Sequence, residues 1–255
     1  MVQEHASVLD VQEIAPSIFQ LFFHSKTIAR QASPGQFVNI AVEGAAAPLL
    51  RRPFSIYSAA SESVSIIFNV VGPGTRALSQ KKSNDVLDVI GPLGNGVFPY
   101  DDDGYETALF VGGGLGVAAL PFLHSRIPSA KKKMSFLGAR NSNQIIRGSL
   151  QNLHVATDDG SEGFHGTVIS LLVSILEKAA VKRPRIYGCG PTRMMRALKE
   201  YALREKIQCY LALECEMACG IGLCQGCPVE SLKGERKFDL VCRDGPVFEA
   251  STVNI

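Results

Sequence analysis

Four cysteines near the C-terminus have the residue type and spacing to bind a metal centre. Cys219, Cys224 and Cys227 follow the pattern C-x4-C-x2-C, and Cys242 comes after 14 further residues. This is the ligand spacing of a plant-type 2Fe–2S cluster, in which four thiolates converge on two irons. The pattern therefore predicts an iron–sulfur centre that carries electrons.

Three glycines stand between these cysteines. Gly220, Gly222 and Gly226 can adopt a positive φ at little steric cost, as a loop that gathers three thiolates requires. Without side chains they also let backbone N–H groups approach the sulfurs, where hydrogen bonds help to set the reduction potential.

Two other chemistries also use clustered cysteines. Zinc takes four thiolates, and its usual C-x2–4-C spacing overlaps this one. Disulfides are the second alternative, but the chain has seven cysteines, an odd number, and we expect no secretory signal. Cys209 and Cys215 lie in and just after an alternating stretch that reads as a strand, where a free thiol is usually a small buried hydrophobe.

The composition is that of a globular protein. The 255 residues are 46% hydrophobic and 20% charged, which suffices for one large domain or two ordinary ones. The net charge of +2 is too small to indicate nucleic acid binding, and the basic run 131–133 reads as a solvated turn. No apolar stretch approaches the ~18 residues of a membrane span. We expect a cytoplasmic protein, where clustered thiols usually bind metal.

The chain changes character twice. Residues 1–99 contain short strands with turn punctuation, which predicts an antiparallel β-barrel. Residues 100–210 begin with a polar hinge at 101–104 and then alternate strand, glycine turn and helix, which predicts a parallel α/β sheet. Residues 211–255 form a small module with the four cysteines. The predicted strands are 18–23, 37–42, 63–70, 86–90, 107–111, 133–137 and 185–187, and the stretch 207–215 reads as a strand and its exit. The predicted helices are 116–123, 168–178 and 192–205.

One strand of the first unit carries a cation, an aromatic ring and a hydroxyl together. Arg52, Phe54 and Ser55 offer a guanidinium that pairs well with phosphate and a ring that can cover a flavin. Pro53 restricts this strand to an edge or a bulge. Taken alone, the segment is more simply an ordinary strand with a capped arginine. The loop 69–75 then adds glycines that would let it and the next helix offer N–H groups to a pyrophosphate.

A second glycine turn opens the α/β unit. Residues 110–119 read as a strand, a turn and a helix, in which Gly114, Gly116 and Ala119 fit G-x-G-x-x-A. A tight turn explains the match as well, although its place between a strand and a helix favours a dinucleotide site. The fingerprint also requires an acidic residue about 20 positions on, yet no Asp or Glu occurs from 107 to 156. Because Arg140 could meet a 2′-phosphate, the residues leave NAD and NADP both open.

The segment Cys189-Gly190-Pro191 follows the strand at 185–187 and opens the next helix. A cysteine there is equally well explained as a buried residue that ends a strand. The five histidines have no metal-binding spacing, and neither G-x-S-x-G nor H-E-x-x-H occurs, so hydrolytic chemistry has no support.

Two motifs of the first unit together resemble the FAD site of the ferredoxin–NADP reductase superfamily. They are Arg52-Pro53-Phe54-Ser55 and, further along the chain, Gly72-Pro73-Gly74-Thr75. With the glycine turn, the Cys-Gly-Pro segment and the terminal cysteines, the whole chain is similar to the electron-transfer subunits of class 1B dihydroorotate dehydrogenase. The stretches 213–227 and 242–248 are close matches to that family.

The resemblance implies a set of site residues. FAD would be lined by Arg52, Pro53, Phe54, Ser55, Asn69, Val70, Val71, Gly72, Gly74 and Thr75. The nicotinamide dinucleotide would be bound by Gly112, Gly113, Gly114, Gly116, Gly190 and Pro191, with Cys189 near the point where hydride passes to the flavin. The 2Fe–2S cluster would be held by Cys219, Cys224, Cys227 and Cys242.

The same resemblance implies an oxidoreductase subunit of pyrimidine biosynthesis with FAD, a 2Fe–2S cluster and NAD. Electrons would pass from the FMN of a dihydroorotate dehydrogenase catalytic subunit through the cluster and FAD to NAD+, in a complex with two copies of each subunit. FAD belongs in the middle because it exchanges both hydride and single electrons. Two alternatives stay open: a flavin–iron–sulfur subunit of another NAD(P)-linked complex, such as a sulfhydrogenase or a ferredoxin-type reductase, and a zinc-stabilised binding module without redox chemistry.

Overall fold

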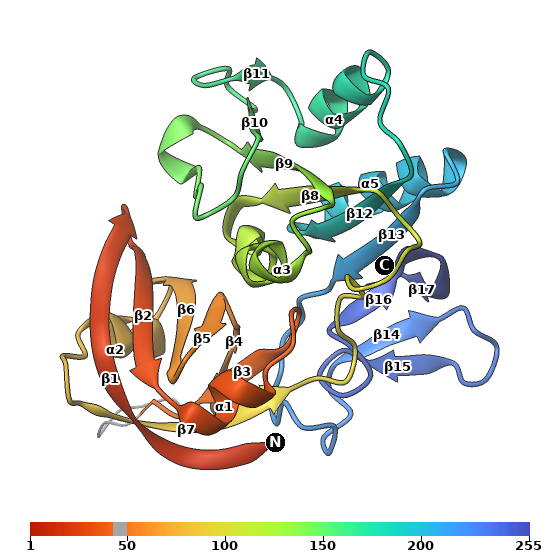
Figure 1. Ribbon diagram of the computed structural model, residues 1–255. Helices are drawn as coiled ribbons and strands as arrows, with labels where there is room; N and C mark the ends of the chain where they lie inside the picture. The colour runs from red at the N-terminus through yellow and green to blue at the C-terminus, as the bar shows by residue number, and fades with distance from the viewer. Residues whose placement is uncertain (43–49) are drawn as a thin grey trace.

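Three β-sheets organise the computed structural model, which describes residues 1–42 and 50–255. Figure 1 shows an antiparallel sheet from the N-terminal part of the chain, an α/β layer above it, and a small C-terminal sheet beside both. None of the helices in the described ranges combines the length and the apolar character that crossing a membrane requires.

The first sheet has the strand order β4-β3-β7-β1-β2-β6-β5, and every neighbouring pair is antiparallel. Alternate side chains point inward along each strand, so that Leu21 and Phe23 of one strand meet Ile66 and Phe68 of the next in one buried core. This sheet confirms the predicted antiparallel barrel. Its elements are β1 (Val2–Ala15), β2 (Ile18–His24), α1 (Lys26–Gln31), β3 (Phe37–Ile40), β4 (Arg52–Ser55), β5 (Ser58–Ala60), β6 (Ser63–Asn69), α2 (Pro73–Ser79) and β7 (Val86–Leu93).

The second sheet has the order β11-β10-β9-β8-β12-β13-β16 and is parallel except for β16. It confirms the predicted parallel α/β unit. Its strands are β8 (Thr107–Gly113), β9 (Lys132–Ala139), β10 (Leu153–Thr157), β11 (Phe164–His165), β12 (Pro184–Cys189), β13 (Gln208–Ala212) and β16 (Val247–Glu249). Its helices are η1 (Gly114–Ala119), α3 (Leu120–Arg126), η2 (Ser142–Gln144), α4 (Val168–Leu176) and α5 (Thr192–Arg204).

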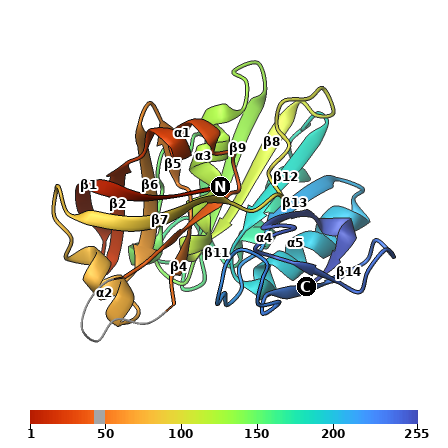
Figure 2. The same ribbon diagram turned by 90° about the horizontal axis from the view of Figure 1, so that it is seen from below.

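The faces of this sheet pack against different partners. Phe110 of β8 and Tyr187 of β12 pack with α3 and with barrel residues such as Ile67. Leu109 and Val111 point to the opposite face and pack with α4 and α5, which lie on the far side of the sheet from the barrel in Figure 2. The barrel and the α/β unit therefore share one continuous core.

The C-terminal module is joined to the α/β sheet by hydrogen bonds. It contains β14 (Pro228–Ser231), β15 (Phe238–Leu240), η3 (Ala250–Thr252) and β17 (Val253–Asn254), with the order β15-β14-β17. Between these strands the chain adds β16 to the edge of the larger sheet, where Leu211 pairs with Phe248. The module is thus joined to the larger sheet through β16.

The linker predicted to be a polar hinge is fixed at its middle. Arg185, only 3% exposed at the start of β12, donates two hydrogen bonds to the Asp102 carboxylate, of 2.6 and 2.9 Å. Tyr187 on the same strand donates to the carbonyl of Pro99 at 2.7 Å. Because of these hydrogen bonds from Arg185, the pKa of Asp102 is lowered, even though partial burial opposes the shift. The linker therefore connects the two units without hinging at this point.

Candidate functional site

A cavity of ≈ 330 Å³ lies where the three units meet. The predicted flavin strand β4 forms one wall, the turn after β8 forms another, and the segment 213–217 forms the third. Seven of the ten predicted FAD residues line it: Arg52, Pro53, Phe54, Ser55, Asn69, Val71 and Thr75. Val70, Gly72 and Gly74 do not. The remaining lining residues are Phe37, Ile67, Phe68, Leu115, Ala118, Leu213, Glu214, Cys215, Met217 and Pro246.

The β4 wall has the properties that the sequence predicts. β4 is an edge strand, which accommodates Pro53. The ring of Phe54 packs on that of Phe68 with centroids 5.6 Å apart. Arg52 donates to the backbone carbonyl of Leu50 at 2.8 Å and makes no ion pair within residues 1–42 and 50–255. Its neighbour Arg51 is paired with the Asp88 carboxylate instead. Arg52 therefore carries the charge that is available to a phosphate group.

The loop after β6 is folded by a threonine. The Oγ1 atom of Thr75 accepts hydrogen bonds from the backbone N–H groups of Val71 and Gly72, at 3.0 and 3.2 Å. Gly72 has an extended φ of −171°, and an added Cβ there would meet nothing within 4 Å. The prediction that this loop offers its N–H groups to a pyrophosphate is therefore corrected for Val71 and Gly72, whose N–H groups Thr75 takes up.

A second cavity, of ≈ 580 Å³, opens at the carboxyl ends of β8, β9, β10 and β12. Ligands of open α/β sheets bind at this edge. Of the predicted dinucleotide residues, Gly113, Gly114 and Pro191 line it, whereas Gly112, Gly116 and Gly190 do not. The turn enters a 3-10 helix, η1, rather than directly an α-helix.

Two of the glycines outside the cavity wall let two loops touch. A Cβ on Gly116 would lie 2.6 Å from the Cα atom of Gly190, and a Cβ on Gly190 would lie 3.0 Å from the N atom of Gly113. Larger side chains would force these loops apart. The structure thus brings the two predicted dinucleotide motifs together.

The four clustered cysteines form two pairs of thiols. The Sγ atoms of Cys227 and Cys242 are 3.1 Å apart. Cys224 lies beside Cys219, to whose sulfur its backbone N–H donates at 3.4 Å. A second N–H, from Ile221, reaches the same sulfur at 3.5 Å. Burial opposes ionisation of Cys219, but these N–H groups outweigh it and lower its pKa to about 6.

This arrangement discriminates between the three chemistries. All seven cysteines are free. The four thiols of the cluster motif stand as two pairs, whereas one tetrahedral zinc ion would gather all four around a single point. A 2Fe–2S cluster takes two ligands on each of its two irons, which matches two pairs of thiols. The residues present therefore fit a 2Fe–2S cluster.

The loop geometry of this module agrees in part with the sequence reasoning. Gly220 and Gly222 have φ values of +70° and +85°, as expected. Gly226 does not have a positive φ; instead the residue before it, Gln225, has a φ of 59°. A Cβ on Gly226 would lie 3.4 Å from the Cys224 sulfur, and its backbone N–H donates to that sulfur at 3.4 Å. The missing side chain at Gly226 therefore lets its backbone N–H approach the Cys224 sulfur, and it is not needed for a positive φ in the turn.

Comparisons with known proteins agree with this geometry. Residues 214–254 match the iron-sulfur cluster binding domain of dihydroorotate dehydrogenase B. The chain is 35% identical over 252 residues to a dihydroorotate dehydrogenase B (NAD(+)) electron transfer subunit of Caldanaerobacter subterraneus subsp. tengcongensis, with 97% of both chains covered. A protein of the same name from Geobacillus kaustophilus is 36% identical, with 98% of both chains covered.

The chain belongs to the family of dihydroorotate dehydrogenase B electron-transfer subunits. Among solved structures, that of an NADH-dependent reduced ferredoxin-NADP oxidoreductase superposes with a TM-score of 0.84 at 29% identity, covering 98% of this chain and 89% of the other. The ferredoxin reductase of carbazole 1,9a-dioxygenase shares the fold, with a TM-score of 0.68 at 20% identity over 81% of this chain and 66% of that one.

In this family member, two carboxylates that the sequence reasoning did not select lie in the cavities. Asp158 directly follows β10 and lines the second cavity together with Arg140. It comes two residues after the stretch in which no acidic residue occurs. The signal that would have found it is the strand at 153–157, whose carboxyl end faces the same edge as the glycine turn.

Glu214 lines the cavity between the three units and contacts Cys189. The Sγ atom of Cys189 donates to its Oε1 atom at 3.9 Å. Cys189 is 1% exposed, and burial raises its pKa well above the usual value. Burial of its carboxyl beside Cys189 raises the pKa of Glu214 as well, although part of the Glu214 side chain is exposed. Both groups therefore hold their protons more tightly than the free side chains do.

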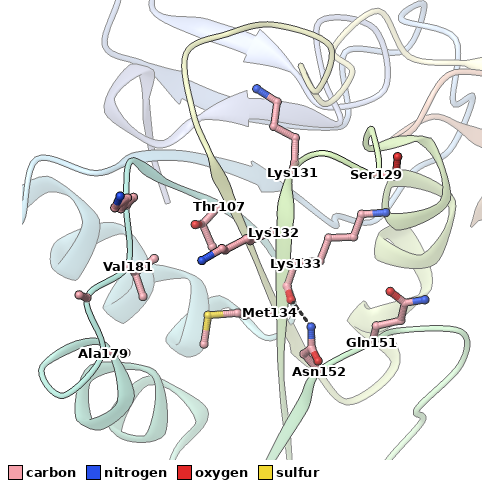
Figure 3. A pocket seen from close by; sticks show the side chains of 12 residues that line it. Thr107, Ser129, Lys131, Lys132, Lys133, Met134, Gln151, Asn152, Ala179 and Val181 are labelled. Carbon is pink, nitrogen blue, oxygen red and sulfur yellow. Dashed lines mark hydrogen bonds between the residues drawn. The ribbon is translucent and has the colours of Figure 1, made fainter.

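A further pocket, of ≈ 570 Å³, lies at the opposite, amino edge of the parallel sheet (Figure 3). The prediction of a solvated turn at 131–133 is corrected here, because Lys132 and Lys133 begin β9. Lys131 donates to the carbonyls of Asp102 and Tyr105, at 2.9 and 2.7 Å. Since ligands of such sheets bind at the carboxyl edge, we assign this pocket no role in the family's chemistry.

Proposed function

We propose that this chain is the electron-transfer subunit of a dihydroorotate dehydrogenase B of pyrimidine biosynthesis. It connects the FMN of a catalytic subunit to NAD+ through a 2Fe–2S cluster and FAD. The observation that carries the proposal is the cavity at the junction of the three units. Its walls combine the flavin motif Arg52–Ser55, the turn of the dinucleotide unit and the segment 213–217, which leads directly to Cys219.

The FAD-binding residues are proposed from this cavity. The guanidinium of Arg52, which makes no ion pair within residues 1–42 and 50–255, binds a phosphate, while Phe54 and Ser55 supply an apolar wall and a hydroxyl. Asn69, Val71 and Thr75 form the adjoining wall, and Thr75 holds the loop in shape. Val70, Gly72 and Gly74 complete the proposed set as the backbone of that loop.

The nicotinamide dinucleotide occupies the cavity at the carboxyl edge of the parallel sheet in this proposal. Gly113, Gly114 and Pro191 form its wall, and the close contact of Gly116 with Gly190 sets its shape. We assign Asp158 to the ribose hydroxyls, since a carboxylate accepts hydrogen bonds from them and repels a 2′-phosphate. This assignment favours NAD over NADP. Gly112 contributes close packing beneath the turn.

The cofactors supply the electron chemistry: bound FAD exchanges a hydride with nicotinamide and single electrons with the cluster. The protein holds them in order and controls protons. Glu214 lines the central cavity and contacts Cys189 at the end of β12, and the raised pKa of each favours its protonated form. Cys219, Cys224, Cys227 and Cys242 are the proposed cluster ligands.

The remaining features of the proposal concern assembly. The three units are 1–99 for FAD, 100–210 for nicotinamide and 211–255 for the cluster, with β16 of the last unit completing the middle sheet. The partner is an FMN-containing catalytic subunit, in a complex of two copies of each chain located in the cytoplasm. The cluster module faces that partner, because Cys224 is the exposed ligand of the four.

The test is an absorption spectrum of the freshly purified chain under anaerobic conditions, before and after NADH. The proposal predicts flavin bands and the broad, longer-wavelength absorption of a 2Fe–2S cluster, both bleached by NADH. A colourless protein, or one that keeps its colour with NADH, contradicts it.

A second candidate function follows from one comparison. The superposition with the NADH-dependent reduced ferredoxin-NADP oxidoreductase covers 98% of this chain. A flavin–iron–sulfur subunit of such a complex would give the same spectrum. It would differ in failing to support NAD+ reduction by dihydroorotate when mixed with an FMN-containing catalytic subunit.

A further inference from the structure

A buried amide joins the barrel to the cysteine loop. Asn39, on β3, is only 1% exposed, and its Nδ2 atom donates to the backbone carbonyl of Cys219 at 3.1 Å. The two residues are 180 positions apart. Because a carbonyl oxygen only accepts, this contact fixes which end of the amide faces the loop. In Figure 1 the C-terminal loops lie beside β3.

The backbone of Asn39 is held on both sides. β3 lies between β4 and β7, and Asn39 pairs with Pro53 of the proposed flavin strand and with Ile90 of β7. Phe37, two residues earlier and so on the same face, lines the central cavity and packs in the core that contains Cys227. One face of β3 therefore supports both the proposed flavin site and the cysteine module.

The loop is pressed against this amide. An added Cβ on Gly220 would lie 2.5 Å from the Nδ2 atom of Asn39. The carbonyl of Cys219 thus points toward Asn39, while the N–H groups of Ile221 and Cys224 point toward its own sulfur. Because the Cys219 carbonyl is held on the side of the loop that faces Asn39, the N–H groups of Ile221 and Cys224 stay on the side that faces the sulfur.

The amide is only half satisfied. Its Oδ1 atom is buried and has no hydrogen-bond partner within the described residues. An unpaired buried acceptor is unfavourable, and an apolar residue of similar size would avoid it. An asparagine at this position is therefore explained by the one bond that it makes, to Cys219.

We propose that Asn39 is a positioning residue for the cluster. It fixes the peptide after Cys219 so that two N–H groups stay directed at the Cys219 sulfur, and it ties this ligand to the strand beside the flavin motif. The inference rests on the proposed function. Hydrogen bonds to a ligand sulfur raise the reduction potential of an iron–sulfur cluster, so losing Asn39 lowers the potential and exposes the cluster to loss.

The experiment compares Asn39→Leu with Val38→Ala in the cofactor-loaded protein. Val38 directly precedes Asn39 on the same strand and is fully buried on the opposite, core-facing side. We expect Asn39→Leu to lose its iron to a chelator about tenfold faster than wild type, the usual effect of removing a partner of a metal ligand. Its cluster potential falls and its FAD content is unchanged. Val38→Ala lowers the melting temperature but leaves the cluster potential at the wild-type value.

Asn39→Ala tests the same contact with a smaller side chain, and it decides the matter if Asn39→Leu does not fold. It also must show faster iron loss and a lower potential, since it too lacks the amide that donates to Cys219. Wild-type values for both properties in the folded variant, or an equal shift in Val38→Ala, overturn the inference. A wild-type protein without flavin and iron would instead contradict the proposed function, so the two failures are distinguishable.

Discussion

The sulfur atoms of Cys227 and Cys242 lie 3.1 Å apart, although 14 residues separate them in the chain. The small C-terminal sheet makes this contact. β14 begins directly after Cys227, β15 ends two residues before Cys242, and Pro228 of β14 pairs with Leu240 of β15. The second pair of proposed ligands is therefore a product of strand pairing, whereas the first pair, Cys219 and Cys224, is formed within one loop.

Replacing one proposed ligand tests the four-thiolate assignment. Cys224→Ser should lose most of its iron and the broad visible absorption of the cluster, since one iron then lacks a thiolate. Flavin should remain bound. Cys209→Ala is the control, because Cys209 is buried in β13 away from this loop. A full 2Fe–2S spectrum in Cys224→Ser would refute the assignment.

Neighbouring arginines provide a matched pair for the flavin site. Arg52→Ala should weaken FAD binding by about tenfold or more, the usual effect of losing a charge-assisted hydrogen bond of ~1.5–3 kcal/mol. Arg51→Ala removes a guanidinium that is already paired with Asp88 and should leave FAD affinity near the wild-type value. Titration of the apoproteins with FAD measures both. Equal FAD affinity of Arg52→Ala and wild type would exclude the phosphate role.

Two adjacent aspartates test the choice of nicotinamide. Asp158→Ala should lower kcat/KM for NADH by about tenfold, through the lost ribose hydrogen bonds, and raise the relative use of NADPH. Asp159→Ala should change neither, because its carboxylate accepts the N–H of Ser161 outside the cavity. Diaphorase assays with an artificial dye give both ratios. An unchanged NADH to NADPH ratio in Asp158→Ala would leave the ribose assignment without support.

The raised pKa of Glu214 predicts a pH-dependent stability. A carboxyl with a pKa raised by burial holds its proton more tightly when folded, so stability falls as pH rises from the unfolded pKa through the folded one. Glu214→Gln removes this loss. The variant should melt at a higher temperature than wild type at about pH 7, and the difference should disappear at about pH 3, below the ordinary Glu pKa. A difference that is the same at both pH values would contradict this.

Local patterns predicted much of the site. The spacing of Cys219, Cys224 and Cys227 lies within one loop, so sequence distance reflects distance in space. The antiparallel and parallel units were predicted from strand length and glycine turns, which are also local. Strand β1 escaped prediction because charged residues such as Glu4 and Asp10 interrupt its apolar alternation over 14 positions.

Contacts between distant segments could not be predicted in this way. Asn39 meets Cys219, and Glu214 meets Cys189, only because separate units pack together. The same holds for β16, which leaves the cysteine module to pair with β13. The reasoning at Gly226 failed for a local cause: the positive φ falls one residue earlier, at Gln225.

The measurement that tests the central claim most directly is NAD+ reduction by dihydroorotate, with this chain and an FMN-containing catalytic subunit assayed alone and together. The account predicts NADH formation only in the mixture, and its loss when Cys224→Ser replaces the wild-type chain. The chain alone should reduce artificial dyes with NADH but leave dihydroorotate unchanged. NADH formation from dihydroorotate by the isolated chain, or by the mixture containing Cys224→Ser at the wild-type rate, would contradict it.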